Sequence, residues 1–154
     1  MIEVTPRLPD EAGPTAAGCF IEQRRRIYML PYARFREQKT WFGVPIDRRM
    51  YRSLAAHEAT HALAACLFTV PNPTIQAKEY IAYVAMFSTM DEALRARALR
   101  ATPGTGFESE ARITPLLYMF DPMRFGAEAY RHYLKPEAGP AFVKAILAGR
   151  ALVD

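Results

Sequence analysis

Two histidines and a glutamate near the middle of the chain have the types and the spacing of a metal site. The segment HEATHALAA, residues 57–65, contains His57, Glu58 and His61. Residues four apart on a helix lie on one face about a turn apart, so both imidazoles could reach one small ion. Glu58 would lie about 100° around the helix from His57, where it could accept a proton from a water on the ion without binding the ion. The pattern predicts a zinc site with Glu58 as its general base.

The extended zinc-binding pattern of the metzincins does not fit this chain. That pattern has a glycine three residues after the second histidine and a third histidine three residues later, where this chain has Ala64 and Leu67. A zinc site still requires at least a third protein ligand. This ligand must therefore come from outside the motif.

Glu79 is the candidate for the third ligand. The helix expected to carry His61 ends near residue 68, and the segment TVPNPT then turns the chain. The helix rises about 10 Å from His61 to residue 68, and an antiparallel helix starting at Thr74 returns by about 7.5 Å at Glu79. We therefore expect Glu79 to lie near the level of His61.

The residues that follow Glu79 support this role. Residues 80–90 read YIAYVAMFSTM and carry no charge, so the helix is expected to be buried. A carboxylate at the edge of such a helix is costly unless it is paired or binds a metal. The alternative is that Glu79 pairs with Lys78, Arg52 or another surface base.

The sequence resembles the gluzincins, which are zinc metallopeptidases with His-Glu-x-x-His on one helix and a ligand glutamate on the next. Here HEATH is followed, after seventeen residues, by Glu79 in KEYIAYV, and the resemblance covers residues 48–88. It is closest to minimal single-domain members and to small bacterial proteins with HEATHAL and EYIAYV segments. The resemblance implies a zincin-like fold, a peptide or protein substrate, Glu58 as general base and one Zn²⁺ per chain bound by His57, His61 and Glu79.

A peptidase also needs a donor for the oxyanion that develops on the substrate. His132 and Tyr130, in the segment AYRHYL, are candidates because their helix must pack near the core. Tyr83, one turn beyond Glu79, is a third candidate, and the alternative for all three is a purely structural role. The hairpin expected near residues 19–30 could offer an edge strand to an extended peptide.

Two other functions compete with peptide hydrolysis. The first is a catalytically silent zinc protein, in which the same three ligands join two helices or the groove binds a partner. The second is a di-iron bundle, because Glu58-x-x-His61 is also the Glu-x-x-His pattern of those proteins. That fold needs a second such motif, and the nearest pair, Glu128 and His132, is one residue too far apart. We therefore discount the di-iron alternative.

The pattern of apolar residues and helix signals predicts one domain over residues 1–154, of the α+β class and mostly α. Residues 1–17 contain three prolines and are expected to form an irregular arm. Residues 18–30 are expected to form a β-hairpin, followed by a short helix and a turn at residues 43–45. Helices are then expected at 48–68 with Asp47 as N-cap, at 74–88, from a Thr89–Glu92 capping box to 101, at 108–120, at 121–134 with Asp121 as N-cap, and from 140 to near 149.

The composition of the chain limits the kinds of binding partner that we expect. The chain is 51% hydrophobic with a net charge of +4, and no run of eighteen apolar residues predicts a membrane span. The only dense basic cluster is residues 24–26, so we predict no nucleic-acid binding. Oligomeric state does not follow from the sequence.

The two cysteines, Cys19 and Cys66, fit neither a zinc ribbon nor a redox pair. They are either free thiols or one disulfide. A disulfide would indicate a periplasmic or secreted protein, and free thiols a cytoplasmic one.

Overall fold

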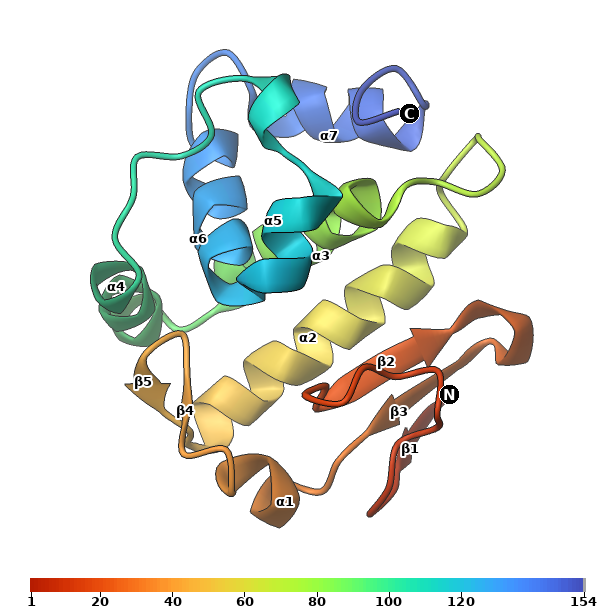
Figure 1. Ribbon diagram of the computed structural model, residues 1–154, viewed down its shortest axis with the longest axis vertical. Helices are drawn as coiled ribbons and strands as arrows, with labels where there is room; N and C mark the ends of the chain where they lie inside the picture. Colours follow the sequence, from red (N-terminus) through yellow and green to blue (C-terminus); the bar gives the residue numbers. More distant parts are fainter. Residues whose placement is uncertain (154) are drawn as a thin grey trace.

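A small sheet from the N-terminal segment packs beside the long helix that carries the two histidines (Figure 1). The computed structural model describes residues 1–153. The sheet has the order β1-β3-β2, with β1 parallel and β2 antiparallel to β3. Its strands are β1 (Ile2–Val4), β2 (Gly18–Ile21) and β3 (Arg26–Met29).

The hairpin expected at residues 18–30 is confirmed, but the irregular arm is only partly correct. Strands β2 and β3 are joined by a 3-10 turn at Glu22–Arg24, which ends at Arg25 with a φ of 47°. The first residues of the arm form β1, whose Ile2 pairs with Ile27. A three-residue strand is invisible to local periodicity because its partner lies far along the chain.

A second, two-stranded hairpin follows the sheet. The expected short helix is α1 (Tyr32–Arg36), and β4 (Thr40–Trp41) pairs with β5 (Val44–Pro45). The turn lies at Phe42 and Gly43, which both have positive φ, so it comes earlier than the expected 43–45.

Helices form the rest of the described chain. They are α2 (Arg48–Ala65), α3 (Ile75–Thr89), α4 (Glu92–Ala101), the 3-10 turn η2 (Glu110–Arg112), α5 (Pro115–Phe120), α6 (Pro122–Tyr133) and α7 (Gly139–Leu147). Side-chain caps explain where several begin. The Asp47 carboxylate accepts the Met50 amide at 2.8 Å, and the Thr74 hydroxyl accepts the Ala77 amide at 3.2 Å. Asp121 caps α6 as expected.

Three helix boundaries differ from the sequence-based expectation. Helix α2 ends at Ala65 instead of near residue 68. The N-cap of α4 is Asp91 instead of Thr89, because the Thr89 hydroxyl donates to carbonyls within its own helix α3. The helix expected at 108–120 is broken into η2 and α5, since Pro115 keeps the residue before it out of the helical conformation.

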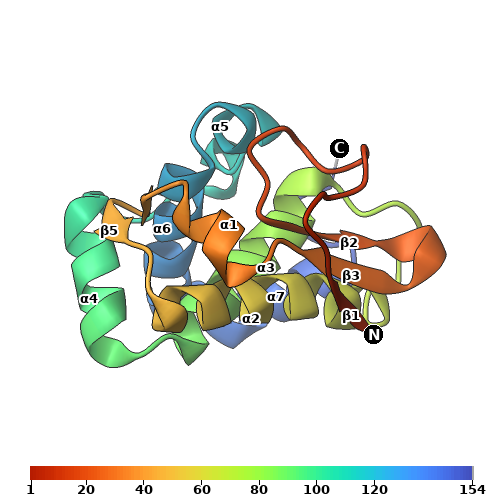
Figure 2. The same ribbon diagram turned by 90° about the horizontal axis from the view of Figure 1, so that it is seen from below.

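Helix α2 lies between the sheet and α3, and α5 and α6 pack on α3 from its other side (Figures 1 and 2). The core between these layers is aromatic and methionine-rich. Its largest fully buried side chains are Tyr80, Phe35, Phe42, Phe87, Phe125, Met50, Met86 and Ile146. The α+β, mostly α class is confirmed. Within residues 1–153, no helix is both long and apolar enough to cross a bilayer.

Candidate metal centre

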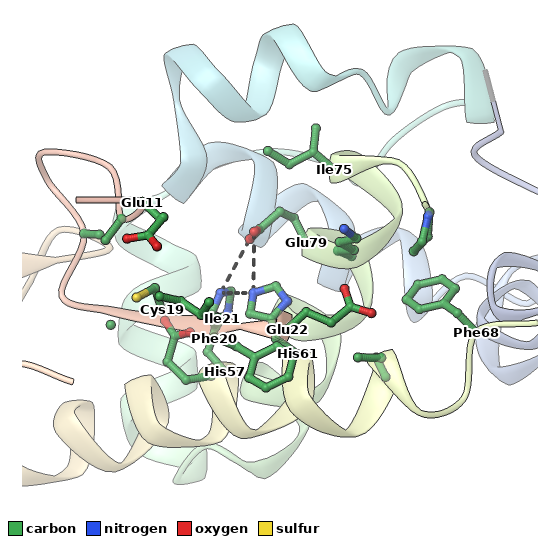
Figure 3. A pocket seen from close by; sticks show the side chains of 18 of the residues that line it. Glu11, Cys19, Phe20, Ile21, Glu22, His57, His61, Phe68, Ile75 and Glu79 are labelled. Atoms are coloured by element: carbon green, nitrogen blue, oxygen red, sulfur yellow. Dashed lines mark hydrogen bonds and ion pairs between the residues drawn. The ribbon is translucent and has the colours of Figure 1, made fainter. Parts of the chain in front are cut away.

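Helix α2 presents His57 and His61 toward the same point in space. Their spacing of four residues aligns the two side chains on one face, and their Nε2 atoms lie 3.1 Å apart (Figure 3). The rings are nearly perpendicular, with centroids 4.7 Å apart. Both ring nitrogens therefore converge without the rings stacking on each other.

Glu79 reaches this point from α3. Its Oε2 lies 3.5 Å from the His57 Nε2, and its Oε1 lies 3.5 Å from the His61 Nε2 (Figure 3). The carboxylate faces the two imidazoles, so the alternative pairing with Lys78 or Arg52 is wrong.

The separation of these atoms fits a shared cation. Ligand atoms at ~2.0–2.1 Å from a tetrahedral ion are roughly 3.3 Å apart. The three side chains each offer one ligand atom within 4.8 Å of the others. Glu79 is buried, and its Oε2 has no hydrogen-bond donor among the described residues. The group His57, His61 and Glu79 could hold a metal ion.

The protonation of His61 and Glu79 agrees with a ligand role. Burial lowers the pKa of His57, but the Glu79 carboxylate raises it above its ordinary value, so a metal would have to displace a proton from that ring. Burial, together with the charge of His57, lowers the pKa of His61 to about 4, so this imidazole is neutral at pH 7. Burial alone would raise the pKa of Glu79, but the two imidazoles that face its carboxylate, His57 above all, lower it below its ordinary value. A neutral imidazole and an ionised carboxylate are the forms that bind metal.

Glu58 lies beside this group but is not one of its three residues. It is buried, with its side chain against the backbone of Gly18 in β2. Burial, opposed by His57 and assisted by Glu79, raises the pKa of Glu58 to about 7. A carboxylate with this pKa can both accept and release a proton near neutral pH.

The metal-binding group opens into a cleft of about 820 Å³. One wall is β2 and the others are α2 and α3, while residues of the arm before β2 border one end. This volume is in the usual range for sites that enclose a small molecule or part of a peptide. The three side chains are therefore reachable from solvent through a defined cavity.

None of the three candidate oxyanion donors borders the cleft. The His132 Nδ1 is 2.7 Å from the Tyr80 hydroxyl in the core, and Tyr130 stacks on Phe87 with ring centroids 5.2 Å apart. The third candidate, Tyr83, is buried with its ring centroid 4.5 Å from that of His57. It packs against the ring of His57.

Two residues of the site were missed in the sequence. Tyr118 of α5 borders the cleft, and its hydroxyl is one of the influences that lower the pKa of Glu79. Gly18 gives the Glu58 carboxylate its space. Neither residue lies near the His-Glu-x-x-His motif in the sequence. The one sequence signal for Gly18 is that a glycine stands at the start of an expected strand, where it has no evident role.

The two cysteines are not bonded to each other. Cys66 is exposed at the end of α2, and Cys19 is half-buried in β2, where it borders the cleft. Burial, with the negative charges of Glu58 and Glu11, raises the pKa of the Cys19 thiol to about 11. Cys19 is therefore protonated at neutral pH.

A comparison with protein-family models places this chain in a family. The model of DUF6639, described as a family of unknown function, matches residues 1–154, and the chain belongs to that family. No curated protein and no solved structure matches the chain.

Proposed function

We propose that this member of the family is a zinc-dependent metallopeptidase that hydrolyses peptide bonds. The observation that carries the proposal is the convergence of the His57, His61 and Glu79 ligand atoms within 4.8 Å, with the buried Glu58 carboxylate beside them and an open cleft in front. A metal that only joined two helices would need neither the cleft nor the extra carboxylate.

The donor set favours zinc. Two imidazole nitrogens and one carboxylate are a ligand set that catalytic zinc sites use, and they leave a position for water. One ion per chain is expected from the single group found among the described residues. The order of the ligands along the chain supports the resemblance of HEATH and Glu79 to the gluzincin pattern.

Zinc and Glu58 would have different roles in the reaction. Zinc, when bound, would supply a Lewis acid that makes water more acidic and polarises the substrate carbonyl. Glu58 takes the proton of the attacking water and passes it to the nitrogen of the leaving amine, with which the peptide bond breaks. Burial of Glu58 holds its pKa near 7, so both transfers are accessible at neutral pH.

Two further features fit a peptide substrate. Among residues 1–153, the outer edge of β2 has no partner strand, because the sheet has the order β1-β3-β2. Strand β2 also borders the cleft. An extended peptide could add to this edge through backbone hydrogen bonds. Tyr118 provides a neutral hydroxyl beside Glu79 and takes the place of His132 and Tyr130 as the candidate oxyanion donor.

Metal analysis and two substitutions test the proposal together. The purified protein, never exposed to chelator, should contain about one zinc per chain, and Glu79→Ala should sharply weaken its binding. Wild type should cleave peptides from a mixed-sequence library, whereas Glu58→Gln should retain zinc and lose hydrolysis. Zinc-loaded wild type that cleaves no library peptide would favour the silent zinc-binding alternative. Unaltered zinc affinity in Glu79→Ala would overturn the ligand assignment.

A further inference from the structure

The cleft extends to both sides of the metal-binding group. Toward Cys19 and Glu11, it is bordered by β2 and the arm, where Glu11 is charged and Phe20 and Ile21 are apolar (Figure 3). On the other side, beyond His61, its walls are mainly apolar. We call this second region the His61-side subsite and define it by Ala64, Ala65, Phe68, Val70, Pro71 and Ile75.

One wall of the subsite continues the metal-binding face of α2. Ala64 and Ala65 follow His61 by three and four residues, which places them on the same face of α2 as that histidine. The two alanines are small enough to leave space, and Phe68, beyond the end of α2, also borders the cleft. A substrate bound at the metal-binding group would therefore lie directly beside an apolar surface.

The opposite wall comes from the first turn of α3. Ile75 precedes Glu79 by four residues, so both side chains lie on one face of that helix. Ile75 is 44% exposed and Phe68 is half-buried, although both are large and apolar. Val70 and Pro71 border the same region from the loop between the helices. These apolar groups face open space that a ligand could fill.

The charged side chains that border this part of the cleft belong to Lys78 and Glu22. Glu22 is exposed at the tip of the hairpin and Lys78 is half-buried. They carry opposite charges, so they create no net preference for an acidic or a basic substrate side chain. The apolar surface therefore decides what binds.

We propose that the His61-side subsite binds a large apolar side chain of the residue next to the cleaved peptide bond, with Phe68 and Ile75 as specificity-determining residues. This inference rests on the proposed function, because it assumes that the bound peptide is cleaved. The binding preference itself can be measured without hydrolysis. Burying a leucine or phenylalanine side chain contributes about 1.5–3 kcal/mol, which corresponds to roughly a tenfold to hundredfold preference.

The test uses the N-acetyl hydroxamates of phenylalanine, leucine, aspartate and glycine with zinc-loaded Glu58→Gln protein. The hydroxamate group anchors each probe on the metal, so affinity differences report the side chain. We expect the phenylalanine and leucine probes to bind at least tenfold more tightly than the other two. Ile75→Ala and Phe68→Ala should each reduce that difference and leave the affinity for the glycine probe unchanged.

Leu63→Ala is the matched control, because Leu63 is 63% exposed on α2 and does not border the cleft. It should preserve the preference. If Phe68→Ala does not fold, Ile75→Ala and the space-filling Ala65→Met provide the same test, and Ala65→Met should weaken the leucine probe most. Equal affinity for all four probes would overturn the subsite even if peptides are cleaved. A clear preference without any peptide hydrolysis would instead retain the subsite and reject the peptidase.

Discussion

Gly18 and Glu58 are in contact across the interface between the sheet and α2. A Cβ atom added at Gly18 would lie 2.7 Å from the Cγ and 2.9 Å from the Oε1 of Glu58. Since Gly18 has no positive φ, a side chain is excluded there by the glutamate and not by the backbone. The strand thus leaves the space in which the proposed base is held.

Gly18→Ala should displace the Glu58 carboxylate and lower kcat by about 10²-fold, because a misplacement of ~1 Å can have that effect. Overpacking should also lower the free energy of unfolding by about 1–3 kcal/mol. Steady-state kinetics and denaturant unfolding measure the two effects, and zinc content should be unchanged. Gly13→Ala is the control, since no atom lies within 4 Å of a Cβ placed there. Full activity in Gly18→Ala would show that the contact does not position the base.

Tyr118→Phe should lower kcat by about tenfold or more with little change in KM, because it removes a donor that acts mainly in the transition state. Peptide hydrolysis at several substrate concentrations separates the two parameters. Tyr130→Phe should leave both unchanged, since Tyr130 packs on Phe87 away from the cleft. An equal loss in the two variants would indicate a general effect on the fold and contradict the assignment.

Metal removal should destabilise the protein. A ligand present at a hundred times its Kd stabilises the folded state by about 2.7 kcal/mol, which for a domain of this size corresponds to roughly 5–10 °C in Tm. We expect EDTA to lower the Tm of wild type by that amount and to have no effect on Glu79→Gln. Calorimetry measures both. Glu37→Gln, which changes an exposed surface carboxylate paired with Arg34, should respond to EDTA as wild type does.

Cys19 should react slowly with iodoacetamide at pH 8 and about tenfold faster with each pH unit up to about 11, since burial and the charges of Glu58 and Glu11 raise its pKa to about 11. The thiolate fraction governs this reaction. The Cys66→Ser variant isolates Cys19, and mass spectrometry follows alkylation. Glu58→Gln in the same background should speed the reaction at pH 8, because one of the charges that raise the pKa is removed. A rate independent of pH above 8 would contradict the raised pKa.

The sequence predicts correctly those helix boundaries and contacts that depend on residues close together in the chain. Asp47, Thr74 and Asp121 stand where their helices begin, because a cap acts on amides only a few residues away. The convergence of His57, His61 and Glu79 follows from helix rise and a single turn, because Glu79 lies on the next helix along the chain.

The missed features depend on contacts between distant segments. Strand β1 pairs with residues about two dozen positions later, and Tyr118 reaches Glu79 from a helix that the sequence pattern merged with its neighbour. His132 was a plausible donor by residue type, but its partner turned out to be the Tyr80 hydroxyl in the core. Local patterns contain no information on which of several helices faces a cleft.

The three proposed ligands stand on two consecutive helices, and the proposed base Glu58 lies between two of them on α2. The apolar subsite is built from the same two helices and the loop between them, whereas Gly18 belongs to the sheet and Tyr118 to a late helix. Residues 57–79 would thus hold the ion, the base and the subsite, while the groups that orient the base and would stabilise the oxyanion are encoded elsewhere. Relatives could alter those outer segments and lose turnover altogether while the helical pair is inherited intact.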